Sequence, residues 1–390
     1  MAAAALPIAE AFSTDPHAAY AQLRDQAPVC RAELPDGSPV WLVTRYADVR
    51  ALLADPRLSV DKSNGNGSWR GFSLPPALDA NLLNMDPPNH TRIRRLVSQA
   101  FTPRRVESLR PRIQQTADAL LDGFAGRAEV DLISEYAGPL PVAVISDLLG
   151  VPEADRAAFR SWTDTMLVPP AGDRAAAARS VVAIHGYLVQ LLAVKHAEPA
   201  DDMLSALIAA REDGDRLSED ELTSLAFLLL LAGYENTVHA IGTGLLTLLR
   251  HPEVPADPRN LGPAVEELLR YEPPASVLLR RFATEDIEVA GVVVPRGETV
   301  LLVVGAANRD PEAFPAPGEV RPGRPGTHLS FGHGIHYCVA APLARIELEI
   351  AIGTVLRRFP RLRLAVPAGE LRWRPSFRAR GLAALPVLVG

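Results

Sequence analysis

The segment Phe331-Gly332-His333-Gly334-Ile335-His336-Tyr337-Cys338 is the most specific pattern in this chain of 390 residues. Two glycines and a histidine stand just ahead of the thiol, and Ala341-Pro342 predicts a helix start, because proline suits the first turn. Glycines let the backbone approach a bulky planar ligand, and N–H groups near a helix start can point at the sulfur. Both features favour the thiolate form of Cys338.

The common roles of a cysteine do not readily account for Cys338. The only other cysteine is Cys30, so a disulfide framework is not expected, and Cys30 is interpreted as a small apolar residue. One cysteine cannot complete a tetrahedral zinc site, and no companion Cys or Cys/His pair lies at zinc-finger spacing. A nucleophilic cysteine served by His333 or His336 as base stays open at this point.

One long helix is well bounded. Ser218 and Glu221 form a capping-box pattern, and the apolar run that follows lasts until His251-Pro252. Roughly 30 residues at 1.5 Å each span about 45 Å, so this helix must cross the molecule. Midway, the apolar residues 228–233 give way to the polar residues 234–237. The helix therefore either turns a polar face to water or passes over a ligand.

Composition restricts the class of protein. The net charge is -6 and no Lys/Arg block occurs, which argues against a nucleic-acid partner. The N-terminus lacks a signal-peptide pattern, and no stretch of about 18 uninterrupted apolar residues follows. We therefore expect a cytoplasmic protein without a membrane partner.

Hydrophobic periodicity predicts mostly helices. Helical spacing covers residues 104–124, 140–149, 174–193 and 202–210, whereas 287–294 and 299–304 have the pattern of strands around the Pro295–Gly297 turn. Residues 61–76 and 311–326 are rich in turn-forming residues and are expected to be loops.

The segment 331–340, with Leu343-Ala344-Arg345 downstream, resembles the haem-binding loop of the cytochromes P450, which reads Phe-Gly-x-Gly-x-His-x-Cys-x-Gly. Ala340 replaces the last glycine. The resemblance implies haem b (iron protoporphyrin IX) with Cys338 as the axial iron ligand. It also implies haem contacts from Phe331, Gly332, His336 and Ala340.

The same resemblance runs from about residue 19 to the end of the chain and implies the fold. We expect one P450 domain over residues 1–390, mainly α, a large helical bundle with small β-sheets. The haem would lie between the long central helix and the helix after the cysteine loop.

Glu267 and Arg270 are spaced i, i+3 and can pair on one helix face. They resemble the Glu-x-x-Arg element of the family, which acts with a later arginine behind the haem. Arg324 is the candidate for that arginine, although Val320-Arg321 stands where Phe-Asp is usual.

A second set of residues resembles the family's haem-propionate contacts. His90 and Arg94 lie one turn apart on a helix that begins at a proline-rich entry. The resemblance adds Arg281 and His336 to this set. A guanidinium and imidazole donors suit carboxylates held inside a protein.

Residues 232–237 of the long helix resemble the oxygen-binding groove of the family. Ala232 and Gly233 correspond to the widening of the helix beside the haem, and Glu235 to the acid of the proton relay. Asn236 stands in place of the usual threonine, and Thr237, one position on, is rotated about 100°. Asparagine has no hydroxyl, so the relay is expected to use ordered water, Thr237 or a substrate group.

The resemblance implies a monooxygenase that inserts oxygen from O2 into a medium-sized, largely apolar natural product. Pocket walls would come from residues 61–85, 166–171 and 275–279 and from the helix positions Phe227, Leu231 and Ala232. No flavin or nicotinamide domain is recognisable, so electrons would come from a ferredoxin and a ferredoxin reductase.

Two other functions stay open. Asn236 motivates the first, oxidative coupling or ring closure without net oxygen insertion. The second is a haem sensor or recruitment module without catalysis, against which the retained Cys338, Glu235 and propionate residues argue.

Overall fold

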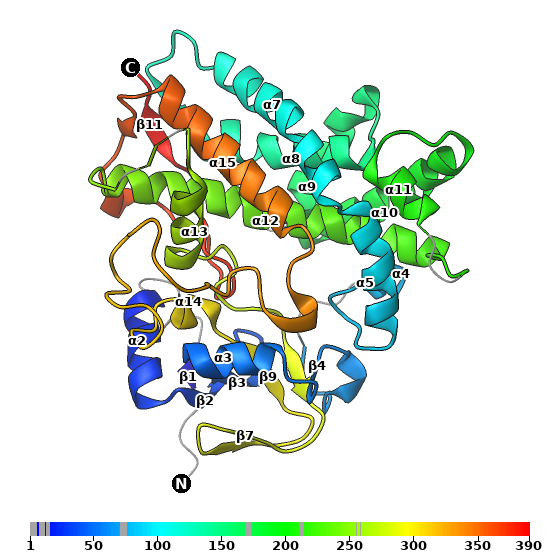
Figure 1. The fold of residues 1–390 in the computed structure, drawn as a ribbon, viewed down its shortest axis with the longest axis vertical. Coiled ribbons are helices and arrows are strands. Elements are labelled where there is room, and N and C mark those ends of the chain that lie inside the picture. Colours follow the sequence, from blue (N-terminus) through cyan, green and yellow to red (C-terminus); the bar gives the residue numbers. More distant parts are fainter. Residues whose placement is uncertain are drawn as a thin grey trace.

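The computed structural model describes residues 6–7, 12, 16–70, 76–167, 173–210, 214–254, 256–257 and 259–390. Helices form one layer and a small sheet with short helices forms the other (Figure 1). The described helices are α2 Pro16–Gln26, α3 Tyr46–Leu53, α4 Pro76–Asp79, α5 Asn89–Ala100, α6 Pro103–Ser108, α7 Arg110–Asp122, α8 Pro139–Leu149, α9 Arg156–Leu167, α10 Arg174–Ala197, α11 Met203–Ala209, α12 Glu219–Arg250, α13 Gly262–Tyr271, α14 Val304–Ala307 and α15 Ala341–Arg358.

The largest sheet has the strand order β1-β2-β3-β9-β6-β4, and two smaller sheets have the orders β10-β11-β5 and β7-β8. Within the large sheet, β3 pairs with β9 in parallel, whereas β6 is antiparallel to β9 and to β4. The strands are β1 Leu6–Pro7, β2 Val29–Glu33, β3 Pro39–Val43, β4 Leu58–Ser59, β5 Glu129–Asp131, β6 Arg281–Ala283, β7 Ile287–Val289, β8 Val292–Val294, β9 Thr299–Leu302, β10 Arg363–Leu364 and β11 Pro386–Leu388.

The prediction that helices dominate is confirmed, and two local predictions need correction. Residues 287–294 are not one strand, because the chain reverses at Ala290 (φ 50°) and Gly291 (φ 79°) to form the β7-β8 hairpin. Residues 104–124 form α6 and α7 in succession instead of one helix.

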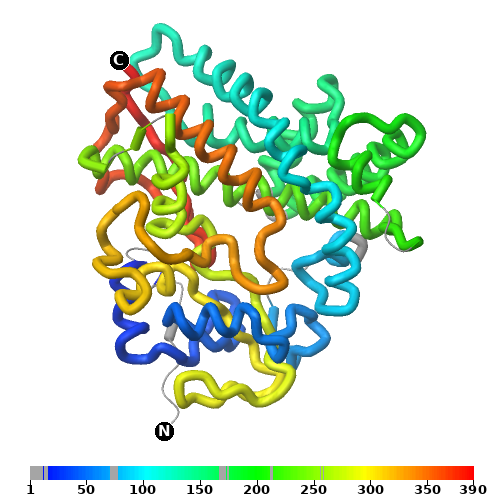
Figure 2. The backbone as a smooth tube through the Cα atoms, viewed as in Figure 1, coloured from blue at the N-terminus to red at the C-terminus, as the bar shows by residue number. Residues whose placement is uncertain are grey.

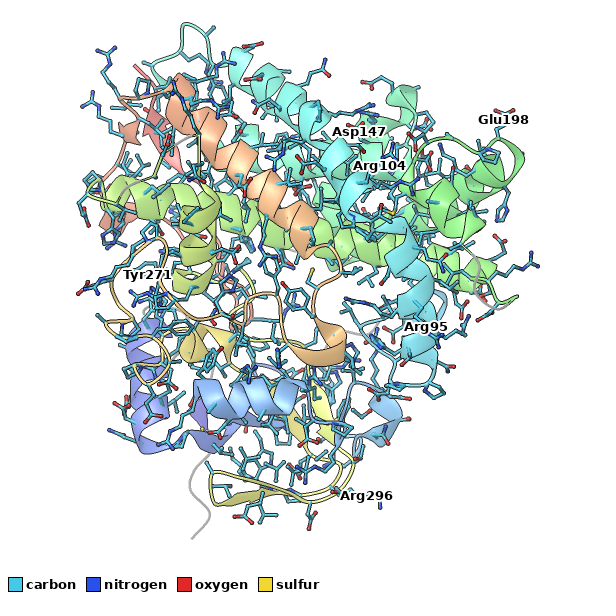
Figure 3. The ribbon with its side chains drawn as sticks, in the orientation of Figure 1. Arg95, Arg104, Asp147, Glu198, Tyr271 and Arg296 are labelled. Atoms are coloured by element: carbon cyan, nitrogen blue, oxygen red, sulfur yellow. The ribbon has the colours of Figure 1, made fainter. Side chains whose placement is uncertain are left out.

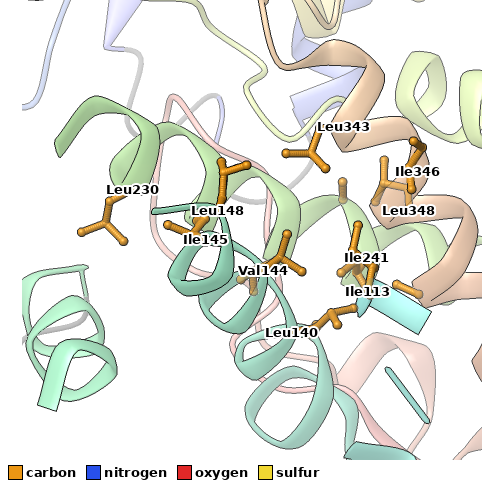
Figure 4. Packing of buried hydrophobic residues seen from close by; sticks show 14 of the residues in the cluster. Ile113, Leu140, Val144, Ile145, Leu148, Leu230, Ile241, Leu343, Ile346 and Leu348 are labelled. Atoms are coloured by element: carbon orange, nitrogen blue, oxygen red, sulfur yellow. The ribbon is translucent and has the colours of Figure 1, made fainter. Parts of the chain in front are cut away.

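The long helix α12 is the axis of the main hydrophobic core. Ser218 and Glu221 form both hydrogen bonds of the capping box, and the helix ends at Arg250 with His251 as its C-cap, as the sequence predicts. Side chains of α8, α12 and α15 interdigitate along it (Figure 4). The backbone trace shows α12 running across the whole width of the molecule (Figure 2).

Two helices, α10 and α12, have the length and hydropathy of a membrane span. Core helices of soluble proteins share these properties, and 61% of the window in α12 is buried inside the protein. For α12 the apolar sequence is therefore accounted for by the core.

The loop before α15 lies beside α12, on the side of the sheet layer (Figure 1). In Figure 3 this loop lies between Tyr271, at the end of α13, and Arg95 of α5. Contacts from both helices fix it, as described next.

Candidate active site

The cysteine loop folds on its own backbone hydrogen bonds. The N–H of Cys338 donates to the carbonyl oxygen of Phe331 at 2.9 Å, and Gly332 N–H donates to Leu329 O at 2.8 Å. Gly332 and Gly334 have φ of 75° and 73°, a region that favours glycine. Ala340, by contrast, has φ -90° as the N-cap of α15, so alanine fits there without backbone strain.

Two opposing effects act on the Cys338 sulfur. Burial raises the pKa of the thiol, while hydrogen bonds from the backbone N–H groups of Ala340 and Ala341 and the charges of Arg94 and Arg345 lower it. The sulfur thus lies at a helix N-terminus among cations. Coordination to a metal cation deprotonates a thiol outright, so this environment suits a metal-bound thiolate.

Arg345 holds the loop against α13. Its guanidinium donates to both carboxylate oxygens of Glu266, at 2.7 and 3.0 Å, and stacks 4.6 Å above the centroid of the Phe331 ring. Burial acts to raise the pKa of Glu266, but His328 and Arg345 together lower it to about 2. This ion pair therefore persists over the whole working pH range.

The Glu-x-x-Arg element forms a buried network. Arg270 donates to both oxygens of Glu267 at 2.8 Å, and these two side chains are 2% and 3% exposed, respectively. Arg324 Nε lies 3.3 Å from Glu267 Oε1 and Arg321 N–H donates to the same oxygen at 2.7 Å. The structure thus places Arg324 where the sequence resemblance puts the third member.

Four donor residues gather beside the cysteine loop. The rings of His90 and His336 are 4.4 Å apart between centroids, and Nε2 of the buried His90 has no hydrogen-bond partner among the described residues. Burial, followed by the charges of Arg281 and His90, lowers the pKa of His336 to about 3. Cationic and imidazole donors from α5, β6 and the loop therefore face one another.

The arginines of this cluster form no ion pair within the described residues. Arg94 donates to Tyr337 O at 2.7 Å, and Arg281 lies 3.5 Å from Leu58 O. Burial lowers the pKa of Arg281 to about 10, opposed by Asp86, whose carboxylate already accepts hydrogen bonds from Ser59 Oγ and Val60 N–H.

Buried guanidinium groups without a carboxylate partner fit an anionic ligand. The cation cluster beside a cysteine sulfur at a helix N-terminus therefore fits haem b. His90, Arg94, Arg281 and His336 would bind the propionates, and Cys338 would bind the iron.

In the middle of α12 one face is open. Ala232 is exposed, although residues before and after this turn are buried. Asn236 Nδ2 donates to Ala232 O at 3.2 Å. Gly233 instead faces α8, where an added Cβ would lie 3.1 Å from Ile145 Cδ1. Ala232 and Asn236 therefore share the open face, and Gly233 permits close packing behind it.

Glu235 and Thr237 point to different neighbours. His239, whose Nε2 lies 3.7 Å from Glu235 Oε1, lowers the pKa of Glu235, and Arg378 adds to this effect while burial opposes it. Thr237 is buried and donates to Gly233 O at 2.7 Å, with its hydroxyl against Glu347 of α15. The structure thus separates Thr237 from Glu235 instead of joining them in one relay.

The residues expected to form the pocket walls differ in how deeply they are buried. Leu231, Ala275, Leu278 and Leu279 are half-buried, whereas Phe227 is fully buried in the main core. Residues 71–75 and 168–171 of the expected walls lie outside the described residues.

Sequence reasoning missed two buried residues near the site, His239 and Glu347. Glu347 follows Arg345 by two positions, and His239 follows Glu235 by four. An ionisable residue on an apolar helix face was the available signal.

Comparisons with known proteins agree with this geometry. A family model, cytochrome P450, matches residues 165–259 and 261–365. The cytochrome P450 monooxygenase PikC of Streptomyces venezuelae is 46% identical over 96% of this chain and 91% of that protein. The mycinamicin IV hydroxylase/epoxidase of Micromonospora griseorubida is 42% identical over 95% of this chain and 94% of that protein.

Among solved structures, the ligand-free P450 monooxygenase TamI superposes with a TM-score of 0.92 at 43% identity, over 100% of this chain and 95% of that chain. Relatives of this kind are soluble bacterial enzymes. The chain therefore belongs to the cytochrome P450 family, and it is a haem b oxidoreductase that acts with O2 on a small molecule and takes electrons from a ferredoxin and its reductase.

Proposed function

We propose that this enzyme inserts one oxygen atom of O2 into a medium-sized, largely apolar natural product of polyketide or macrolide type, as a tailoring step of secondary metabolism. The supporting observation is the open face of α12 at Ala232, bordered in sequence by half-buried apolar residues such as Leu231. An apolar lining with few polar anchors suits such substrates. A relative named as a mycinamicin IV hydroxylase/epoxidase supports the same class.

The haem, when bound, supplies the iron at which O2 is activated. Each side chain then has a proposed role around it. Cys338 would bind the iron through its thiolate, and His90, Arg94, Arg281 and His336 would neutralise the propionates. Phe331, Gly332 and Ala340 would give the cysteine loop its close approach to the ring, and Ala232 would let α12 pass beside it while Gly233 packs against α8. We further propose that residues 1–390 form one domain and that the protein is cytoplasmic.

Glu235 is proposed to deliver protons from the protein surface. Its carboxylate lies 3.7 Å from the half-exposed Arg378, so it can exchange protons with solvent and turn toward the open face. Asn236 Nδ2 is committed to Ala232 O, which leaves Oδ1 to accept a hydrogen bond from water or from a substrate hydroxyl. Thr237, directed at α15, is proposed to support α12 and not to pass protons directly.

Product mass decides between oxygen insertion and oxidative coupling. Purified enzyme, with a ferredoxin, a reductase and NADPH, would be supplied with a macrolide such as mycinamicin IV under 18O2. We expect one 18O atom in the product. Loss of two hydrogens without 18O would support coupling, and tight substrate binding without turnover would support the non-catalytic reading.

A further inference from the structure

The open face of α12 continues past Glu235 to a histidine. At 100° per residue, Ala232, Asn236 and His239 lie within about 60° of one another around the helix. Ala232 is exposed, whereas His239 is only 2% exposed. His239 thus lies where this face of α12 becomes buried under another segment of the protein.

Two contacts define the position of this imidazole. His239 Nε2 lies 3.7 Å from Glu235 Oε1, one turn away on the same helix. The opposite side of the ring is covered by Gly381, where an added Cβ would lie 2.0 Å from Nδ1. His239 Nδ1 is buried and has no hydrogen-bond partner among the described residues. Among the described residues, the polar group nearest to the ring is therefore the Glu235 carboxylate.

The segment that carries Gly381 also brings charge to Glu235. Arg378 Nη2 lies 3.7 Å from Glu235 Oε2, and Arg374 acts on the same carboxylate over a longer distance. From α12 itself, Thr243 Oγ1 donates to His239 O and leaves the ring untouched. Glu235 therefore lies between His239 on one side and Arg378 of the C-terminal segment on the other, each 3.7 Å from a carboxylate oxygen.

We propose that His239 is a positioning residue for proton delivery, whose Nε2–H faces the Glu235 carboxylate at 3.7 Å and orients it. Since no described residue donates to Nδ1, the Nε2–H tautomer is the one that places a proton toward the Glu235 carboxylate. The fixed carboxylate then delivers each proton from one geometry. This inference rests on the proposed role of Glu235 in proton transfer.

The chain offers a graded set of variants. His239→Asn keeps a side-chain N–H donor but cannot titrate, and His239→Leu removes the donor. Gly381→Ala keeps the histidine, but its Cβ must displace the ring from Glu235. His251→Asn is the control, because His251 lies just beyond α12 and pairs with Glu253 at 3.1 Å.

Two readouts test the proposal in the haem-loaded protein. The first is coupling, the product formed per NADPH consumed, between pH 5.5 and 8.5. We expect it to fall about tenfold in His239→Leu and Gly381→Ala and to stay within about twofold of wild type in His239→Asn and His251→Asn. Because His239 lowers the pKa of Glu235, the acidic limb of the profile should move to higher pH in His239→Leu.

The second readout is independent of turnover. It is the NMR spectrum of 15N-histidine-labelled protein in its ferrous carbon monoxide complex. The ring resonance of His239 is identified as the one that is lost in His239→Asn. This resonance should have the chemical shift of an Nε2–H tautomer, and it should move in Glu235→Gln. If Glu235→Gln leaves coupling unchanged, the proposed role of Glu235 fails. Two results would refute the positioning role of His239. In the first, Glu235→Gln loses coupling but His239→Leu and Gly381→Ala couple as well as wild type. In the second, coupling in His239→Asn falls as far as it does in His239→Leu. Should His239→Leu fail to fold, Gly381→Ala and the resonance shift carry the test.

Discussion

Thr237 of α12 and Glu347 of α15 are buried neighbours in the contact between the two helices that flank the cysteine loop. The Thr237 hydroxyl donates its hydrogen to Gly233 O at 2.7 Å, and its effect on Glu347 is to lower the pKa of that carboxyl. Burial outweighs this effect and raises the pKa of Glu347 to about 8, so the carboxyl is protonated below that pH. A neutral acid therefore lies between α12 and α15.

Glu347→Gln should flatten the dependence of stability on pH. The unfolded chain loses this proton above its ordinary pKa of 4.5, whereas the folded protein keeps it up to about 8. Stability from this group is thus fully present below 4.5 and is lost as pH rises through that window. In Glu347→Gln, urea unfolding at pH 8 should show a free energy of unfolding about 2–4 kcal/mol above wild type, with little change at pH 4.5.

Glu349→Gln is the control for that experiment. Glu349 lies on the same helix but pairs with Arg110 at the surface, at 3.4 Å, so its loss should cost about 0–1 kcal/mol at either pH. An unaltered pH slope in Glu347→Gln would show that Glu347 is ionised in the folded protein.

Arg324→Ala should destabilise the region behind the haem, whereas Arg321→Ala should not. The Arg324 side chain is 6% exposed and reaches Glu267, while the Arg321 side chain is 57% exposed and pairs with Glu319. Breaking a buried pair costs about 3–5 kcal/mol, and an exposed one about 0–1. Thermal unfolding and haem content after expression would measure both. Equal effects of the two changes would remove Arg324 from the network.

Local signals predicted the elements on which the site is built. The capping box at Ser218 and the stop at His251-Pro252 set α12 correctly, because caps and prolines act through their own backbone. At the reversal, Gly291 was the available turn signal, but Ala290 before it gave none, since alanine rarely adopts positive φ.

Tertiary contacts limit what the sequence can say about the site. Helical periodicity places Thr237 about 140° from Ala232, but it does not name the residue that fills that direction, Glu347. Likewise, the cover of His239 by Gly381 joins segments far apart in the chain. The resemblance did predict residues that lie together in the structure, such as His90 and His336. They lie together because each is part of an element whose position the fold fixes.

Arg281→Gln should weaken haem retention more than Arg280→Gln. Both arginines are buried, Arg281 at 6% and Arg280 at 4% exposed. The charge of Arg281 lowers the pKa of His336, whereas Arg280 donates to Asn84 Oδ1 at 2.7 Å. A charge-assisted hydrogen bond contributes about 1.5–3 kcal/mol, so haem transfer to an excess of apomyoglobin should be about 10- to 100-fold faster in Arg281→Gln. Comparable rates in the two variants would mean that fold stability, and not a propionate contact, controls retention.

Cys338→Ala should separate haem binding from the thiolate bond. His90, Arg94, Arg281 and His336 come from α5, β6 and the loop, so the propionate contacts should still retain part of the haem. Without the anionic sulfur, the reduced carbon monoxide complex should lose the carbonyl band that gives the family its name, and turnover should cease. Cys30→Ala is the matched control, because Cys30 is the only other cysteine and lies in β2. It should keep both the band and turnover, and persistence of the band in Cys338→Ala would contradict the assignment of Cys338 as the iron ligand.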